Sequence, residues 1–400
     1  MYTRYFFSIL VIISIISCDN KKSVEESNQV LPANKSKDYQ KIGVKDNLPV
    51  FYDKLKERMD FPLSWLSGNY NNFEEWKKIA RQKMLDCLIY EPPAVPFHPV
   101  VIGEEDRGTY VVKRVILNIS ADSRILTYLL EPKGKGPFPG ALLLHDHSAT
   151  FEIGKEKMVR PFDETEERIE FSQHFVNSSY GGRYVGDELA KRGYICFVID
   201  ALNWGDRGGG GYEGQQAISG NLLHLGASFA GLIAYEDIRS AEFLANQPKV
   251  DKARILSIGL SMGSFRSFQI AALSDHITAA ISICWMISVK EQMKPGANKV
   301  RGNSAYTMLH PTIFKYLDHM DIAGIACPKP MLFYHGRYDK LFPVPGVEEA
   351  YEKLHKIWAS QGADSKLETK IWDVPHQFNQ EMQEEAFMWL DKVLLKEKSK

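Results

Sequence analysis

The pentapeptide Gly-Leu-Ser-Met-Gly at residues 259–263 decides the fold of this chain. An apolar run at 254–259 precedes it, and a run of helical character at 264–273 follows it. This order predicts a buried strand, a sharp turn at Ser261 and a helix. Such a turn strains the serine backbone and brings strand and helix so close that only glycine fits on either side. The exposed hydroxyl then has the position of a nucleophile; the alternative is a chance turn of small residues.

The sequence on both sides of this turn alternates between buried strands and helices. Apolar runs predict strands at 140–145, 193–200 and 277–286, and further strands are expected at 330–335 and 367–372. Helical periodicity predicts helices at 184–192, 227–246, 347–360 and 382–395. Such alternation is typical of a parallel sheet with helices on both faces. Two alternating runs, at 110–119 and 124–131, predict an antiparallel hairpin before it. The expected class is therefore α/β, with a mostly parallel central sheet, helices on both faces and an antiparallel N-terminal hairpin.

A chain of 400 residues that is 44% hydrophobic can form one large domain with additions. We divide it into a lipoprotein signal peptide at 1–17, a flexible tether at 18–45, an N-terminal helical extension at 46–105, and a catalytic domain at 106–400 with insertions near 150–180 and 288–326. Within the catalytic domain, the polar stretch at 152–179 is expected to be an insertion, and residues 203–226 a long glycine-rich loop.

The N-terminus has the pattern of an export signal. Arg4 is followed by an apolar run at 6–16, which is too short for a mature membrane span, and the run ends in Ser17-Cys18. This ending resembles the lipobox of bacterial lipoproteins. The resemblance implies cleavage before Cys18, lipid on its sulfur, and anchoring in the cell envelope on the periplasmic or cell-surface side. The alternative is an ordinary signal peptide with an incidental cysteine.

Composition argues against several other classes of function. The net charge is −1, so no nucleic-acid partner is expected. The four cysteines beyond Cys18 show no Cys-x-x-Cys spacing, so no metal site is expected. Gly209, Gly211 and Gly214 match a dinucleotide-binding pattern, but they lie well past the nearest strand and open no clear helix. We therefore expect no cofactor.

A serine nucleophile needs a base, and the base needs an acid that orients it. Asp339 follows the strand at 330–335, and His376 follows the last predicted strand. Ligands of such sheets bind at the carboxyl ends of the strands, where both residues lie. The chain order Ser, Asp, His is that of the α/β-hydrolases. Asp373 is an alternative acid, and His335 is expected to pack within its turn rather than act as the base.

With these motifs the chain resembles the dienelactone-hydrolase-like and acetyl-xylan-esterase-like branch of the α/β-hydrolase superfamily, over residues 110–395. The resemblance implies Ser261 as nucleophile, Asp339 as acid and His376 as base. True dienelactone hydrolases use cysteine as the nucleophile, so their specific activity is not expected here. Glucuronoyl esterases carry an arginine inside the serine motif, where this chain has Met262, and they match less well.

An ester hydrolase must also stabilise the oxyanion that forms on the substrate. The backbone N–H of Met262 is the expected first donor. In the family the first strand usually ends in His-Gly and supplies a second donor; here it ends in His145-Asp146-His147. The N–H of His147 is our expected second donor, with Asp146 as the alternative. Each such donor is worth about 3 kcal/mol of transition-state stabilisation.

Four side chains are candidates for substrate binding. We expect Trp204 to stack on a sugar ring and Arg207 to bind a carboxylate. The alternative for this loop is a buried Trp204 and an Arg207 paired with Asp206. Arg266 faces either substrate or a partner carboxylate, and Trp285 is expected to line the pocket.

These observations predict an exported serine esterase whose partner is an ester-decorated oligo- or polysaccharide. Acetyl esters and uronate methyl esters both remain open. A serine peptidase or a small-molecule ester or lactone hydrolase is the alternative. A non-catalytic binding module would be expected to have lost one of the three catalytic residues, and all three are present.

Overall fold

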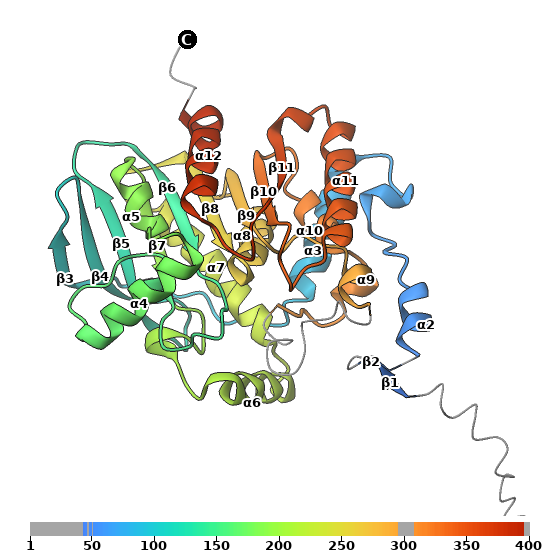
Figure 1. The fold of residues 1–400 in the computed structure, drawn as a ribbon, viewed down its shortest axis with the longest axis horizontal. Helices are drawn as coiled ribbons and strands as arrows, with labels where there is room; N and C mark the ends of the chain where they lie inside the picture. Colours follow the sequence, from blue (N-terminus) through green and yellow to red (C-terminus); the bar gives the residue numbers. More distant parts are fainter. Residues whose placement is uncertain (1–42, 46–47, 50, 295–307, 396–400) are drawn as a thin grey trace, which may run out of the picture. The chain divides into compact units, whose positions relative to one another are not determined.

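The computed structural model describes residues 43–45, 48–49, 51–294 and 308–395. Its central element is a nine-stranded sheet with the order β11-β10-β9-β8-β6-β7-β5-β4-β3 (Figure 1). The strands are β3 Val100–Asp106, β4 Tyr110–Asn118, β5 Arg124–Pro132, β6 Phe138–Leu144, β7 Ile195–Ile199, β8 Val250–Leu260, β9 Ala279–Ile283, β10 Met331–Gly336 and β11 Leu367–Trp372. Strands β6 to β11 pair in parallel, and β3, β4 and β5 pair antiparallel. The predicted fold class is confirmed. A separate two-stranded pair joins β1 Val44–Lys45 and β2 Leu48–Pro49.

Helices cover both faces of this sheet (Figure 1). The α-helices of the described residues are α2 Tyr52–Glu57, α3 Phe73–Asp86, α4 Glu166–Ser179, α5 Val185–Lys191, α6 Gly211–His224, α7 Phe229–Ala245, α8 Met262–Leu273, α9 Val289–Gln292, α10 His319–Gly324, α11 Val344–Ser360 and α12 Gln380–Leu390; not all of them pack on the sheet. One core contains α3, α7, α8, α10 and α11, and the other contains α4, α5 and α12. Along β6, Leu142 and Leu144 enter the first core while Ala141 and Leu143 enter the second. Both faces of the strand are therefore buried, which explains its continuous apolar sequence.

The sequence analysis missed strand β3, which pairs antiparallel with β4 at the edge of the sheet. Val100, Val101 and Ile102 are about half exposed, and acidic residues follow them. An edge strand with both faces partly solvated lacks the alternation on which the prediction depends.

The glycine-rich stretch at 203–226 contains helix α6, so the prediction of one long loop is wrong. Only Gln215 and Ser219 are buried in this helix, and Leu225 just after it is 80% exposed. Its fully buried side chains are polar, and its inward-facing apolar residues Ile218 and Leu222 are only partly buried against the first core, so the apolar stripe of the helix is weak. Hydrophobic periodicity could not reveal it.

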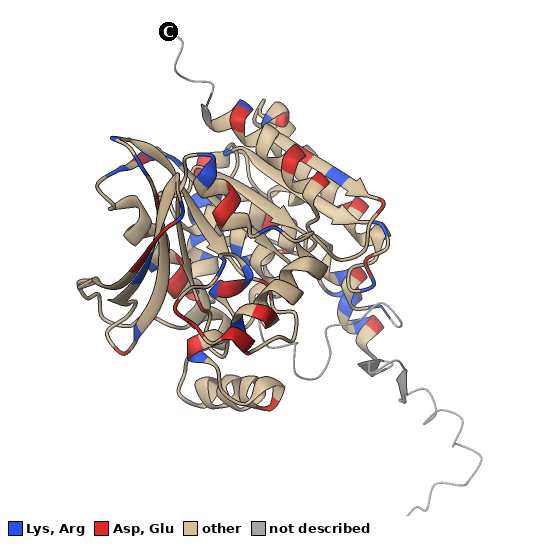
Figure 2. Ribbon diagram, turned by 60° about the vertical axis from the view of Figure 1, so that its left-hand side comes forward, with Lys and Arg blue, Asp and Glu red and all other residues tan. Residues whose placement is uncertain are grey.

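Helix α6 begins at Gly211, within the dinucleotide-like glycine pattern. The statement that this pattern opens no clear helix is therefore wrong, although the pattern still begins well beyond the end of β7. Helix α6 contains one carboxylate, that of Glu213, and no lysine or arginine, so it is drawn almost entirely in tan in Figure 2.

Among the described residues, no single helix is both long and apolar enough to cross a bilayer, and α6 and α7 meet that criterion only as a pair bent by 91°.

Candidate active site

Ser261 occupies the strained turn that the sequence predicts between β8 and α8. Its backbone dihedrals are φ 56° and ψ −120°, in a region that non-glycine residues rarely adopt. A Cβ on Gly263 would lie 1.9 Å from the carbonyl oxygen of Leu144, and one on Gly259 would lie 2.4 Å from the backbone of Gly263. The two glycines are therefore required by the close approach of β6, β8 and α8.

The hydroxyl end of this turn opens into a pocket of about 280 Å³ that Ser261, Met262 and His376 line together. The backbone N–H of Ser261 donates to the carbonyl of Ile283 at 2.8 Å, which ties the turn to β9. Met262 is the first residue of α8, so its N–H is one of the helix donors without an intrahelical acceptor. That donor is available to an oxygen bound beside Ser261.

His376 and Asp339 form a hydrogen-bonded pair at the rim of this pocket. Nδ1 of His376 lies 2.6 Å from Oδ2 of Asp339, and the other Asp339 oxygen accepts the N–H of Leu341 at 2.7 Å. Burial opposes ionisation of Asp339, but the hydrogen bond and charge of His376 outweigh it and lower the pKa of the carboxyl. An ionised Asp339 fixes the imidazole proton on Nδ1 and leaves Nε2 able to accept a proton.

The structure thus brings Ser261, Asp339 and His376 to one end of the sheet, as the sequence analysis expected. Among the described residues, the Ser261 hydroxyl has no hydrogen-bond partner. Hydrogen bonds between a nucleophile and its base are often long before substrate binds and tighten with it.

The two alternative residues lie elsewhere. Asp373 is 73% exposed and pairs with Arg337 at 2.6 Å, so its carboxylate is engaged away from His376. His335 is buried and its Nε2 donates to the carbonyl of Phe342 at 3.0 Å. It packs within the turn, as expected.

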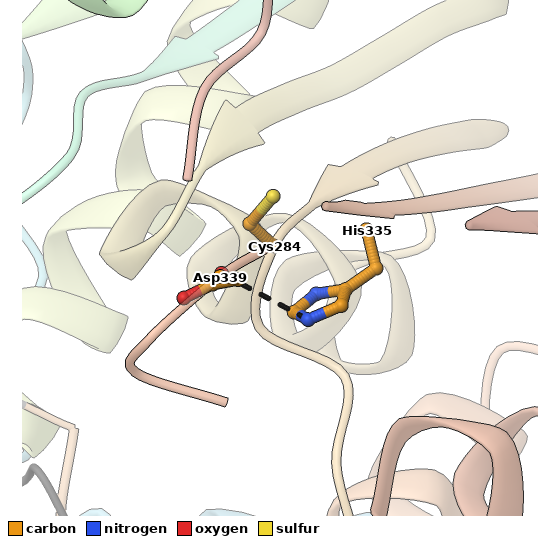
Figure 3. A group of neighbouring side chains, drawn as sticks. All are labelled: Cys284, His335 and Asp339. Atoms are coloured by element: carbon orange, nitrogen blue, oxygen red, sulfur yellow. Dashed lines mark ion pairs between the residues drawn. The ribbon is translucent and has the colours of Figure 1, made fainter. Parts of the chain in front are cut away.

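Cys284 and His335 form a buried cluster with the Asp339 side chain. Figure 3 shows Cys284 and His335 beside Asp339, with Nε2 of His335 at 3.9 Å from Oδ2 of the carboxylate. One ligand-type atom of each residue lies within 4.8 Å of the others. However, His376 already binds Oδ2, and burial raises the pKa of the Cys284 thiol, which keeps it neutral. The donor set therefore suits packing better than a metal ion.

The segment after β6 forms the opposite wall of the pocket. Asp146, His147 and Ser148 all line it. Nδ1 of His147 accepts the N–H of Ala149 at 3.1 Å, so Nε2 donates to the amide oxygen of Gln215, also at 3.1 Å. Burial lowers the pKa of His147 to about 4. Its imidazole is thus neutral and engaged, and its backbone N–H is the group left for a substrate oxygen.

Trp204 and Arg207 do not line the pocket, which corrects the role that the sequence analysis assigned to them. Strand β6 lies between β7 and β8, so the loop after β7, which carries both residues, is not next to β8, the strand that leads to Ser261. Trp204 is fully buried and its Nε1 donates to the carbonyl of His147 at 3.1 Å. Arg207 binds both carboxylate oxygens of Glu236 at 2.6 and 2.7 Å, rather than Asp206.

Arg266 faces a partner carboxylate, the second of its two predicted alternatives. It is fully buried and contacts both oxygens of Asp237 in α7, at 2.9 and 2.7 Å. Trp285 lines the pocket as expected, with its ring 4.9 Å from that of Phe342. Tyr212 also lines it, and the sequence analysis missed this residue because it missed helix α6.

The polar segment near 150–180, predicted as an insertion, contains buried charge. Lys155, Glu156 and Lys157 are all fully buried. Nζ of Lys155 lies 2.9 Å from Asp200 and 2.6 Å from Asp206. Periodicity carries no signal for such a cluster, because pairing rather than hydrophobicity offsets the cost of burial.

Comparison with known proteins finds hydrolases. A family model described as the Abhydrolase family matches residues 25–357. YtaP of Bacillus subtilis (strain 168), which is named as a hydrolase, is 26% identical over 288 residues, 72% of this chain and 89% of YtaP.

Solved structures with a similar fold include three esterases by name. A Bacteroides fragilis protein named as an acetyl xylan esterase has a TM-score of 0.64 at 18% identity, covering 80% of this chain and 82% of that one. Methylesterase BT1017 has a TM-score of 0.59 at 16% identity, covering 85% of this chain and 68% of that one. A glucuronoyl esterase from Solibacter usitatus has a TM-score of 0.57 at 14% identity, covering 88% of this chain and 96% of that one. At these identities the similarity shows a shared fold alone.

Proposed function

The chain belongs to the abhydrolase family, and from this premise we propose that it is a serine esterase that cleaves carboxylic esters through an acyl-enzyme. One observation carries the proposal. Ser261, in a strained strand-to-helix turn, shares a pocket with His376, whose Nδ1 lies 2.6 Å from the Asp339 carboxylate.

The proposed mechanism assigns one task to each group. His376, oriented by Asp339, takes the Ser261 proton as the oxygen attacks the ester carbonyl. The N–H groups of Met262 and His147 stabilise the oxyanion. His376 then protonates the leaving alcohol. In the second half of the reaction His376 takes a proton from water, the water oxygen attacks the acyl carbonyl, and the proton returns to the Ser261 oxygen as the carboxylic acid leaves.

The proposed substrate is an ester on a polysaccharide, with acetyl esters as the first candidate. The aromatic side chains of Tyr212, Trp285 and Phe342 line the pocket and supply faces on which sugar rings stack. In the described part of the chain, no lysine or arginine lines it. Hydrolysis of a uronate methyl ester leaves a carboxylate on the acyl side, and Arg207 and Arg266, which would bind it, are held by Glu236 and Asp237. Uronate methyl esters therefore stand second.

Product analysis tests the proposal. Wild type and Ser261→Ala are incubated with acetylated xylan and with methyl-esterified pectin, and released acetate and methanol are quantified separately. We expect acetate from wild type and neither product from Ser261→Ala. Release of methanol without acetate would make uronate methyl esters, rather than acetyl esters, the first candidate substrate. Cleavage of an aryl acetate without either product would favour the small-molecule esterase, and unchanged turnover in Ser261→Ala would refute the serine mechanism.

We also propose that Cys18 carries a lipid that anchors the protein in the cell envelope. Cys18 lies outside the described residues, and the proposal rests on the lipobox-like sequence alone. Metabolic labelling with an alkyne fatty acid tests it. Label is expected on wild type and not on Cys18→Ser, and equal labelling of both would refute it.

A further inference from the structure

The side chain of Lys157 lies directly beneath the segment that lines the pocket opposite His376. Its Nζ is fully buried and lies 3.0 Å from the carbonyl oxygen of Asp146, 3.2 Å from that of His147 and 3.0 Å from the Ser148 hydroxyl. Lys157 does not itself line the pocket. The ammonium therefore contacts this segment from outside the pocket.

Peptide geometry gives these contacts a consequence for the pocket. In a planar trans peptide the carbonyl and the N–H of the next residue point in opposite directions. The carbonyl of Asp146 points to Lys157, so the N–H of His147 points away from it, to the pocket side. The carbonyl of His147 points to Lys157 and Trp204, so the N–H of Ser148 also points away from Lys157, to the pocket side. Two successive N–H groups facing one way form an anion-binding concavity.

The charge environment of Lys157 differs from that of its buried neighbour Lys155. Lys155 contacts carboxylates at 2.6 to 2.9 Å, which is a direct reason for a cation there. The carboxylate nearest to Lys157 is that of Asp146, at 4.0 Å. A buried ammonium without a close counter-ion is costly, and its hydrogen bonds all go to the pocket segment. The contacts that offset the cost of burying this ammonium are therefore those with the segment at 146–148.

We propose that Lys157 is a positioning residue of the oxyanion site: it holds the carbonyls of Asp146 and His147 so that the N–H groups that follow face the substrate. This inference rests on the proposed serine esterase function. When protonated, the Lys157 ammonium also adds a positive charge behind the place where negative charge develops in the transition state.

Replacement of Lys157 by methionine, which keeps the chain length and removes the ammonium, tests the proposal. We expect kcat on an aryl acetate to fall about 10- to 100-fold, a part of the loss seen when an oxyanion donor is removed, with KM within twofold of wild type. Inactivation by diethyl p-nitrophenyl phosphate, which places a phosphoryl oxygen in the oxyanion site, should slow in parallel. Rates are expressed per active site titrated, so incomplete folding does not lower them.

Lys329 provides a matched control. Its Nζ also binds two backbone carbonyls, those of Ala271 and Ser274 at 2.8 and 2.9 Å, at the end of α8 remote from Ser261. Burial lowers the pKa of both lysines to about 8. We expect Lys329→Met to lose stability to a similar degree and to keep the wild-type kcat.

The possible results separate this inference from the proposed function. Wild-type kcat in Lys157→Met, or an equal loss in Lys329→Met, would overturn the role of Lys157 while leaving the serine mechanism intact. If Lys157→Met does not fold, Lys157→Gln is measured in its place against the same two criteria. Absence of ester turnover in wild type would instead refute the proposed function.

Discussion

Asp339 and His376 lie in loops that follow the adjacent parallel strands β10 and β11, and their side chains meet at 2.6 Å. The register pairs Gly336 with Trp372, the last residues of the two strands. Parallel strands in register end at the same edge of a sheet, so the loops that leave them are neighbours. The sheet, rather than local sequence, thus joins the two residues.

Asp339→Asn should abolish most of the activity while the fold is retained. The amide cannot hold the His376 proton on Nδ1 as the carboxylate does, and kcat is expected to fall by about 10³- to 10⁴-fold. Asp373→Asn is the matched control, because Asp373 is exposed and paired with Arg337. Its kcat should equal that of wild type. The kcat of both variants is measured on an aryl acetate by steady-state kinetics. A fall in kcat in Asp373→Asn but not in Asp339→Asn would assign the role of the acid to Asp373 instead.

Arg266→Met should destabilise the protein without changing KM. The substitution leaves the buried Asp237 carboxylate unpaired, which is expected to cost about 3–5 kcal/mol in the free energy of unfolding. Arg337→Met breaks an exposed, solvent-screened pair and should leave the free energy of unfolding nearly unchanged. Urea denaturation measures both. A raised KM with unchanged stability would return Arg266 to the substrate site.

Two glycines should respond oppositely to alanine. In Gly263→Ala the new Cβ would meet the Leu144 carbonyl at 1.9 Å, so we expect a loss of several kcal/mol or no folded protein. Gly220 lies inside α6 with no atom within 4 Å of its Cβ position. Gly220→Ala should stabilise the helix by about 0.5–1 kcal/mol. Thermal unfolding distinguishes them, and a stable Gly263→Ala protein would contradict the described turn.

Acid should destabilise the protein partly through His147, whose pKa burial lowers to about 4. The unfolded chain binds this proton with an ordinary pKa of about 6.5, so the contribution is full above that pH and is lost as pH falls toward 4. Between pH 7 and pH 5 it amounts to about 2 kcal/mol. In His147→Gln the free energy of unfolding should therefore depend less on pH by that amount. Equal pH dependence in the two proteins would show that His147 is not held neutral.

The strands and the order of the catalytic candidates were predictable because each rests on local pattern. Continuous apolar runs marked β7 and β9, and the glycines around Ser261 marked the turn. Edge strand β3 and helix α6 were not predicted because many of their apolar side chains are exposed to solvent, which weakens the periodic pattern. The position of Lys157 was also not predicted, because the sequence alone does not distinguish a buried lysine from a lysine at the surface.

By itself, the sequence determined the α/β class, the strained turn at Ser261 and the residues able to act with it, because buried strands and close-packed turns restrict which residues fit. Only the tertiary structure decided which polar groups face the pocket. It placed Arg207 and Arg266 on buried carboxylates and Asp373 in solvent, and it brought Lys157 beneath the segment after β6. A charged side chain takes whichever partner the fold brings within reach, and that partner lies far away in the sequence.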